Sequence, residues 1–121
     1  MTEYTFSVPA LGDLLDLADN PNLDKLEFGV VKMDLTGKVL LYNQAESTIT
    51  GVTTEQATGK HFFTQIAPCT NNFMVALRYD EAPLDEELDY IFTYVTTPIR
   101  VRLRLLRASG SAHQYLLVKK V

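Results

Sequence analysis

The clearest structural signal in this chain is the run Ile99-Arg100-Val101-Arg102-Leu103-Arg104-Leu105. Aliphatic and arginine side chains alternate along it, and alternate residues of a β-strand point to opposite faces of a sheet. The pattern predicts a strand with one buried face and one face in water, which is typical of antiparallel sheets. The arginines are expected to form the face in water.

Four other segments have the composition of strands, and they lie at residues 28–33, 38–43, 90–96 and 115–118. The first two are joined by a short loop that ends at Gly37, a residue suited to a positive φ. Together with the arginine strand, these segments predict an α+β domain. We expect one five-stranded antiparallel sheet with short helices packed on it.

Residues 1–26 are expected to form an N-terminal helical cap on a core of residues 27–121. Leu11, Leu14, Leu15 and Ala18 recur at the spacing of one helix face. Between the strands we expect a polar turn at 44–50, a helical turn at 53–58, a short helix over 73–77 and a solvated acidic run at 80–87.

The composition limits the class of protein. The 121 residues fit a single domain, and the net charge of −4 disfavours nucleic acid and anionic membranes as partners. No segment approaches the ~20 apolar residues of a membrane span. The first residues show no signal-peptide pattern, and a single cysteine suits a reducing compartment, so we expect a cytoplasmic location.

Cys69 is the only cysteine, so it can form neither an internal disulfide nor a thiolate metal site. It is either a buried filler or a reactive sulfur. Residues 70–72 favour the start of a helix, and a helix start directly after Cys69 would stabilise a thiolate. Phe62 and Ile66 supply apolar bulk on the upstream side. This setting suggests that a group is covalently attached to Cys69.

The order of elements resembles the PAS domain, and individual residues extend the resemblance to the photoactive yellow protein family. The combination of Tyr42, Glu46 and Thr50 with Ala67-Pro68-Cys69-Thr70 is highly specific at this spacing. Further matching pieces are residues 26–29, 41–46, 49–51, 59–63, 66–70, 97–98 and 118–121, with Tyr94. The resemblance implies a blue-light photoreceptor with 4-hydroxycinnamic acid (p-coumaric acid) bound as a thioester to Cys69.

The resemblance also implies roles for the other residues. A buried phenolate needs hydrogen-bond donors, which Tyr42 and a protonated Glu46 can supply, while Thr50 is expected to hydrogen-bond Tyr42. Two like charges in one apolar site are unfavourable, so Glu46 is expected to be neutral in the dark. The remaining residues expected around the chromophore are Val52, Phe62, Ala67, Thr70, Phe92, Tyr94 and Thr96.

Two of these positions depart from the family pattern. The family usually has an arginine where this chain has Val52, and a methionine where it has Thr96. In relatives the methionine sulfur is thought to assist the return to the dark state, a contact that threonine does not offer. Dark recovery is therefore expected to be slower than in relatives with the methionine.

Two other functions compete with the photoreceptor. One is a PAS-type module for ligand binding or protein interaction without a photocycle, in which Cys69 is structural. The other is a cysteine-nucleophile enzyme, which needs a base near the thiol. The chain offers His61, eight residues upstream, with no evident orienting partner. We expect a monomer that is not an enzyme and that signals to a downstream protein partner of unknown identity.

Overall fold

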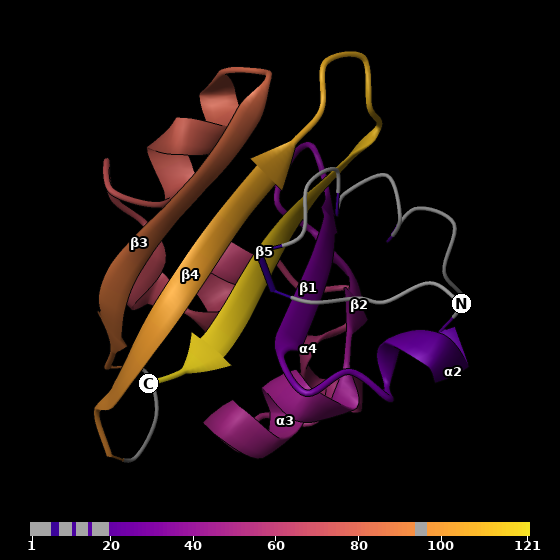
Figure 1. The fold of residues 1–121 in the computed structure, drawn as a ribbon, viewed down its shortest axis with the longest axis vertical. Helices are drawn as coiled ribbons and strands as arrows, with labels where there is room; N and C mark the ends of the chain where they lie inside the picture. Colours follow the sequence, from indigo (N-terminus) through magenta and orange to yellow (C-terminus); the bar gives the residue numbers. More distant parts are fainter. Residues whose placement is uncertain (1–5, 8–10, 12–14, 16–19, 94–96) are drawn as a thin grey trace.

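The structure is a computed structural model that describes residues 6, 7, 11, 15, 20–93 and 97–121 (Figure 1). One antiparallel sheet has the strand order β2-β1-β5-β4-β3. The strands are β1 (Gly29–Asp34), β2 (Val39–Tyr42), β3 (Leu84–Phe92), β4 (Ile99–Arg107) and β5 (His113–Lys120). The predicted α+β class and the five-stranded antiparallel sheet are confirmed.

The short helix α2 (Asn20–Leu23) precedes β1, and further short helices connect β2 to β3. They are α3 (Gln44–Thr50), α4 (Thr54–Ala57), a π-helical turn (Phe62–Ile66) and two 3-10 turns (Pro68–Thr70 and Ala76–Asp80). The segment 44–50, expected to be a polar turn, is the helix α3. Asn43 caps its N-terminus, and Gly51 ends it in the left-handed conformation at φ 78°.

Alternate residues of the sheet point into two cores. The first core contains Val31, Met33, Tyr42, Val101, Leu103, Leu105, Leu116 and Val118, with Ala57, Phe62 and Phe63 from the helical side. The second contains Val30, Leu41, Leu106, Tyr115 and Leu117, with Phe6, Leu11, Leu15, Leu23 and Phe28. Neighbours such as Leu116 and Leu117 fall in different cores because successive strand residues face opposite sides. Residues near the N-terminus, together with Leu23 of α2, therefore cover the sheet face opposite α4 and the π-helical turn.

The predicted helical cap is described only in part. Leu11 and Leu15 are buried in the second core, whereas Leu14 and Ala18 lie outside the described residues. The boundary of the cap at residue 26 stays a prediction.

One predicted strand boundary and one predicted helix are wrong. β3 begins at Leu84 rather than at residue 90, so half of the acidic run is strand, although Asp85, Glu86 and Glu87 remain exposed. A helix over residues 73–77 does not form, and a 3-10 turn begins at Ala76 instead. The apolar run that predicted this helix is only partly buried, because Phe73 and Leu77 are exposed to solvent.

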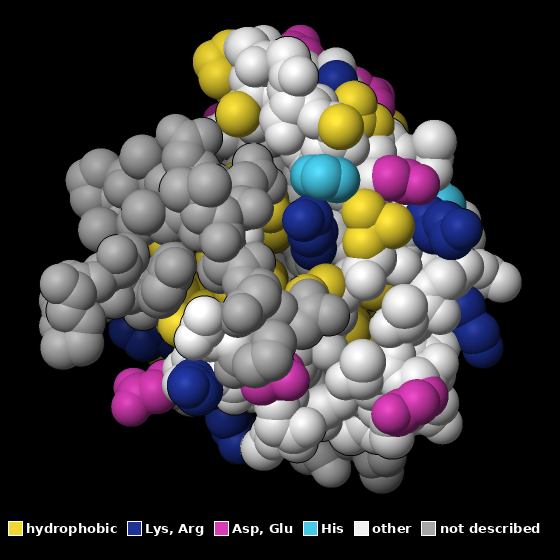
Figure 2. Space-filling model, turned by 90° about the vertical axis from the view of Figure 1, so that its right-hand side faces the viewer, with side chains coloured by type: hydrophobic (Ala, Val, Ile, Leu, Met, Phe, Trp, Pro, Cys, Tyr) yellow, Lys and Arg dark blue, Asp and Glu magenta, His cyan; other side chains and the backbone are white. Residues whose placement is uncertain are grey.

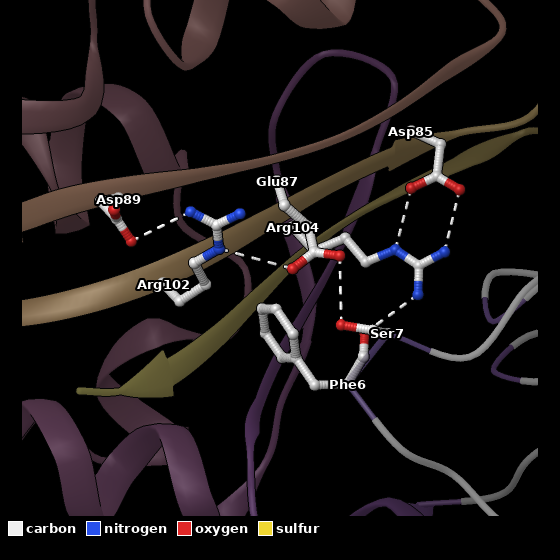
Figure 3. Close-up of polar contacts among 7 residues, drawn as sticks. All are labelled: Phe6, Ser7, Asp85, Glu87, Asp89, Arg102 and Arg104. Carbon is white, nitrogen blue, oxygen red and sulfur yellow. Dashed lines mark hydrogen bonds and ion pairs between the residues drawn. The ribbon is translucent and has the colours of Figure 1, made fainter.

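The arginine row is not uniformly in water. Arg100 is exposed, but Arg104 is only 3% exposed, because residues near the N-terminus cover this part of β4. Its guanidinium donates to both carboxylate oxygens of Asp85 at 2.9 Å and to the Phe6 carbonyl at 2.9 Å (Figure 3). Ser7 Oγ donates to Glu87 at 3.1 Å beside it. The alternating sequence pattern alone could not show that residues near the N-terminus cover the arginine face of β4 at Arg104.

Asp85→Asn is expected to destabilise the fold, because the buried Arg104 guanidinium loses its counter-charge. Urea unfolding at neutral pH should show a loss of roughly 1–3 kcal/mol, limited because the Asp85 side chain is 54% exposed. Asp89→Asn is the matched control. Asp89 pairs with Arg102 at 3.0 Å, but its side chain is 81% exposed, so little change is expected. Equal losses in both variants would contradict the role of Arg104 as a buried anchor.

Candidate functional site

The side chain of Asn43 fixes the first turn of α3 against β1. Asn43 is 1% exposed, and its Oδ1 accepts from the backbone N–H of Val30 at 2.8 Å and of Glu46 at 3.1 Å. Its Nδ2 donates to the carbonyls of Leu23 at 2.9 Å and Phe28 at 3.1 Å. The helix that carries Glu46 and Thr50 therefore has a defined position relative to the sheet. An asparagine followed three residues later by glutamate is a helix-start signature that sequence analysis missed.

Glu46 is fully buried, with 0% exposure. Both of its carboxyl oxygens lack a hydrogen-bond partner among the described residues. It packs against Gly29 of β1, where an added Cβ would lie 2.0 Å from Glu46 Oε2. Burial raises the pKa of Glu46 to about 8, so the side chain is a neutral carboxylic acid at neutral pH. A buried acid of this kind is a hydrogen-bond donor directed at the interior.

Tyr42 and Thr50 are joined beside Glu46. The hydroxyls of Tyr42 and Thr50 are 2.7 Å apart, so the expected hydrogen bond is present. Thr50 Oγ1 also lies 2.9 Å from the Glu46 carbonyl, to which it can donate. Because Thr50 has a single hydroxyl proton, it can serve only one of these acceptors at a time. The direction of the Tyr42 hydroxyl therefore depends on where the Thr50 proton points.

An apolar cluster surrounds Tyr42. Phe62, Ala67 and Phe92 belong to the same buried core as Tyr42, and Val52 packs against this core from the link between α3 and α4. Phe62 comes from the π-helical turn, Ala67 from the link to the next 3-10 turn, and Phe92 from the end of β3. The structure thus brings five of the predicted residues together. Tyr94 and Thr96 lie outside the described residues.

Cys69 is half-buried in the 3-10 turn that begins at Pro68. Its carbonyl accepts hydrogen bonds from Tyr90 Oη and from Asn72 Nδ2, the latter at 3.0 Å. The Tyr90 ring lies 6.4 Å from the Phe92 ring, which belongs to the apolar cluster. The Cys69 backbone is therefore tied to β3 next to that cluster. The helix expected to begin directly after Cys69 does not form, so the argument from a helix dipole is wrong.

Several neighbours complete the arrangement. Thr70 is fully buried, and its hydroxyl donates to the Ala67 carbonyl at 2.7 Å, which fixes the turn on the far side of Cys69. His61 packs against the Phe63 ring at 6.1 Å. Sequence analysis missed the roles of Gly29 and Tyr90, since each depends on contacts between segments that are distant in sequence. It identified Asn72 only as a cap-type residue and did not predict the bond to Tyr90.

The residues around Tyr42 and Glu46 fit a bound phenolic group, and the evidence is the buried carboxylic acid of Glu46, which has no hydrogen-bond partner among the described residues. A donor buried without an acceptor is costly, and an aromatic phenolate held beside Tyr42 would supply the missing acceptor. Apolar walls from Phe62 and Phe92 suit an aromatic ring. Within the described part of the chain, no helix is long and apolar enough to span a membrane.

Without a bound group, the protein is expected to lose stability as the pH rises from 5 to 8. The folded state keeps the Glu46 proton up to about pH 8, whereas the unfolded chain releases it near the usual value of 4.5. The stabilising contribution is therefore complete below pH 4.5 and is lost as the pH rises through about 8. The largest loss is roughly 5 kcal/mol, at about 1.4 kcal/mol per pH unit for one proton.

Glu46→Gln provides the comparison, because the amide does not titrate and fills nearly the same volume. Urea unfolding of both proteins at pH 5, 6, 7 and 8 measures the difference. The wild-type curve should fall more steeply than that of the variant. Parallel curves would show that Glu46 titrates normally in the fold.

Comparisons with known proteins agree with this architecture. The family model of the PAS fold matches residues 22–118. Photoactive yellow proteins of Rhodothalassium salexigens and Halochromatium salexigens are 34% and 33% identical over 112 residues, and each match covers 89% of both chains. The photoactive yellow protein domain from the sensor histidine kinase Ppr of Rhodospirillum centenum superimposes with a TM-score of 0.81 at 29% identity. That match covers 89% of this chain and 98% of the domain. The chain therefore belongs to the photoactive yellow protein family, a family of PAS-fold photoreceptors.

Proposed function

We propose that this chain is a blue-light receptor that binds 4-hydroxycinnamic acid as a thioester on Cys69. The observation that carries the proposal is Glu46, a fully buried carboxylic acid whose oxygens have no partner among the described residues. A phenol oxygen held between Glu46 and Tyr42 would accept the hydrogen bond that Glu46 offers. Bound there, the group supplies absorption of blue light and trans–cis isomerisation.

The protonation states follow from electrostatics. An ionised Glu46 beside a phenolate would place two negative charges in one apolar site, so only one of them is ionised. Glu46 keeps its proton in the dark, consistent with its raised pKa, and donates a hydrogen bond to the phenolate. For Tyr42 to donate as well, the Thr50 proton must point to Tyr42 rather than to the Glu46 carbonyl. The direction of the Thr50 hydroxyl proton thus determines whether the phenolate accepts hydrogen bonds from both Glu46 and Tyr42 or from Glu46 alone.

Illumination is proposed to move the proton of Glu46 to the phenol oxygen. The carboxylate that remains is buried against Gly29, where a charge is costly. Two connections carry this strain away from the site. Gly29 pairs with Val118 in the sheet, and Asn43 joins the first turn of α3 to the carbonyls of Leu23 and Phe28.

The second connection leads to the residues near the N-terminus. Leu23 and Phe28 pack in the same core as Phe6, Leu11 and Leu15. A displaced α3 would disturb this core and so loosen the cap on residues 1–26, which makes the cap the signalling element. We propose that the remaining part, residues 27–121, acts as the sensing core.

The proposed setting is a cytoplasmic monomer that signals to another protein and performs no enzymatic reaction. The net charge of −4 argues against nucleic acid as a partner. The face drawn in Figure 2 carries basic and acidic side chains interspersed, without a broad basic patch on that face. A PAS-type module with Cys69 in a structural role is the alternative.

Attachment is tested with activated 4-hydroxycinnamate. The wild-type protein should turn yellow and gain one chromophore mass, whereas Cys69→Ala should do neither, because the thioester needs the sulfur. Circular dichroism should show an unchanged fold, since the substitution removes only one half-buried atom. A colourless, unmodified wild type would favour the alternative module, and a covalent adduct in Cys69→Ala would refute the assignment of Cys69.

Glu46→Gln tests the proton donor in the loaded protein. The amide still donates an N–H bond, so the phenolate should persist, but its band should shift to longer wavelength because the amide withdraws less charge. Infrared difference spectra should lose the protonated-carboxyl signal that disappears on illumination. Glu55→Gln, an exposed glutamate of α4, is the control and should keep that signal. Persistence of the signal in Glu46→Gln would identify another acid as the donor.

A further inference from the structure

Three large apolar side chains are exposed directly after the Cys69 turn. Phe73 is 76% exposed, Leu77 is 57% exposed and Met74 is 38% exposed. They follow each other within five residues, in the segment that lies beside β3 in Figure 1. Single exposed apolar residues are common, but such a group on a small protein marks an interaction surface. We call Phe73, Met74 and Leu77 the apolar patch.

A surface hollow of about 330 Å³ adjoins the apolar patch. Its lining comes from two residues of the patch, the segment that links the patch to β3, and the start of β3: Phe73, Leu77, Arg78, Glu81, Pro83, Leu84 and Glu86. The hollow is large enough for one or two side chains of a partner and too small for a whole helix. It would receive anchoring side chains, as the centres of protein interfaces do.

Charge indicates which partner fits. Arg78 is engaged by an ion pair with Glu86 and by a hydrogen bond from its Nε to the Met74 carbonyl at 2.8 Å. Glu81 has no ion pair among the described residues, so the lining keeps a net negative charge. A second copy of this chain would bring the same acidic side chains against each other in a two-fold interface, which is unfavourable. The surface instead suits apolar side chains flanked by lysine or arginine.

Asn72 connects the apolar patch to the proposed chromophore site. Its Oδ1 accepts from the backbone N–H of Met74 at 2.9 Å and of Val75 at 3.2 Å. Its Nδ2 donates to the Cys69 carbonyl at 3.0 Å and to Tyr90 Oη at 2.7 Å. A movement of the Cys69 backbone would therefore change the hydrogen bonds of Asn72, the residue that also binds the backbone of Met74 in the patch.

We propose that the apolar patch is the docking surface for a partner protein that presents apolar side chains beside lysine or arginine. Asn72 transmits the state of Cys69 to this surface, so that light changes the affinity for the partner. The second statement rests on the proposed function, because it requires a light-absorbing group on Cys69. The first does not, and it is tested in the dark.

The dark test uses a fluorescently labelled helical peptide of leucine and lysine, with a matched peptide in which glutamate replaces lysine. The lysine peptide should bind the wild-type protein, loaded or unloaded, and the glutamate peptide should not. Phe73→Ser with Leu77→Ser should weaken binding at least tenfold in fluorescence anisotropy. The control is Leu40→Ser with Ile91→Ser, which removes two large apolar residues that are exposed elsewhere, at 40% and 49%, and should change the Kd less than twofold.

Equal losses in the two double variants would mean that the peptide binds by general attraction to an acidic protein, and the docking surface would be refuted. Sedimentation of the same proteins tests for self-association. A wild-type dimer that the Phe73 and Leu77 substitutions convert to a monomer would assign the surface to a second copy and also overturn the proposal.

The light test measures the peptide Kd of the loaded protein before and during blue illumination. The wild-type Kd should change at least threefold. Asn72→Asp keeps the oxygen that caps Met74 and Val75 but loses the donor to Cys69 and Tyr90, so the ratio of the two values should fall to about one. A protein that bleaches normally without any change in Kd refutes the coupling through Asn72. A wild type that does not bleach refutes the proposed function, and the dark test then decides the docking surface alone.

Discussion

The fold depends on an asparagine that uses every hydrogen-bonding position of its side chain. An amide has two N–H donors and two acceptor positions on its oxygen, and Asn43 fills all four with backbone groups of β1, α3 and the segment before β1. Hydrogen bonds made inside a protein to a buried amide leave no alternative partner if one is lost. One side chain thereby sets the distance between the sheet, the helix of the site and the chain that leads to the N-terminus.

Three residues further along, Glu46 presents the opposite situation. It is as buried as Asn43, yet its carboxyl oxygens have no partner among the described residues. Buried polar groups are nearly always paired, so an exception needs a physical reason. The hydrogen bonds of Asn43 explain how the exception can persist, because a movement of α3 that brought Glu46 to water would have to break them. The hydrogen bonds of Asn43 hold the helix in place, and the carboxylic acid of Glu46 is left with a proton that it can donate to a bound group.

A period-two pattern predicted β4 and strand-like composition predicted the other four strands, although β3 begins six residues earlier than expected. The alternation in β4 could not show that a second layer covers Arg104. The same alternation of aliphatic and arginine residues fits a strand whose arginine face is in water and a strand whose arginine face is covered. The helix over 73–77 was predicted from apolar composition, but composition does not say whether a segment is buried. The pairing of Tyr42 with Thr50 followed from a family resemblance, whereas Gly29 and Tyr90 act through contacts that no local pattern encodes.

The position of β3 at the edge of the sheet has a consequence for behaviour in concentrated solution. An open edge strand offers unpaired backbone groups to any other extended chain and is a common start of aggregation. Here β3 carries Asp85, Glu86, Glu87 and Asp89, each of which pairs with an arginine. A second β3 laid alongside would crowd and desolvate these charged side chains, which is unfavourable. Hydrogen bonds from Arg104 lower the pKa of Asp85, which keeps that charge in mildly acidic solution. The strand whose Tyr90 hydrogen-bonds the Cys69 carbonyl thus also disfavours edge-to-edge pairing with a second molecule.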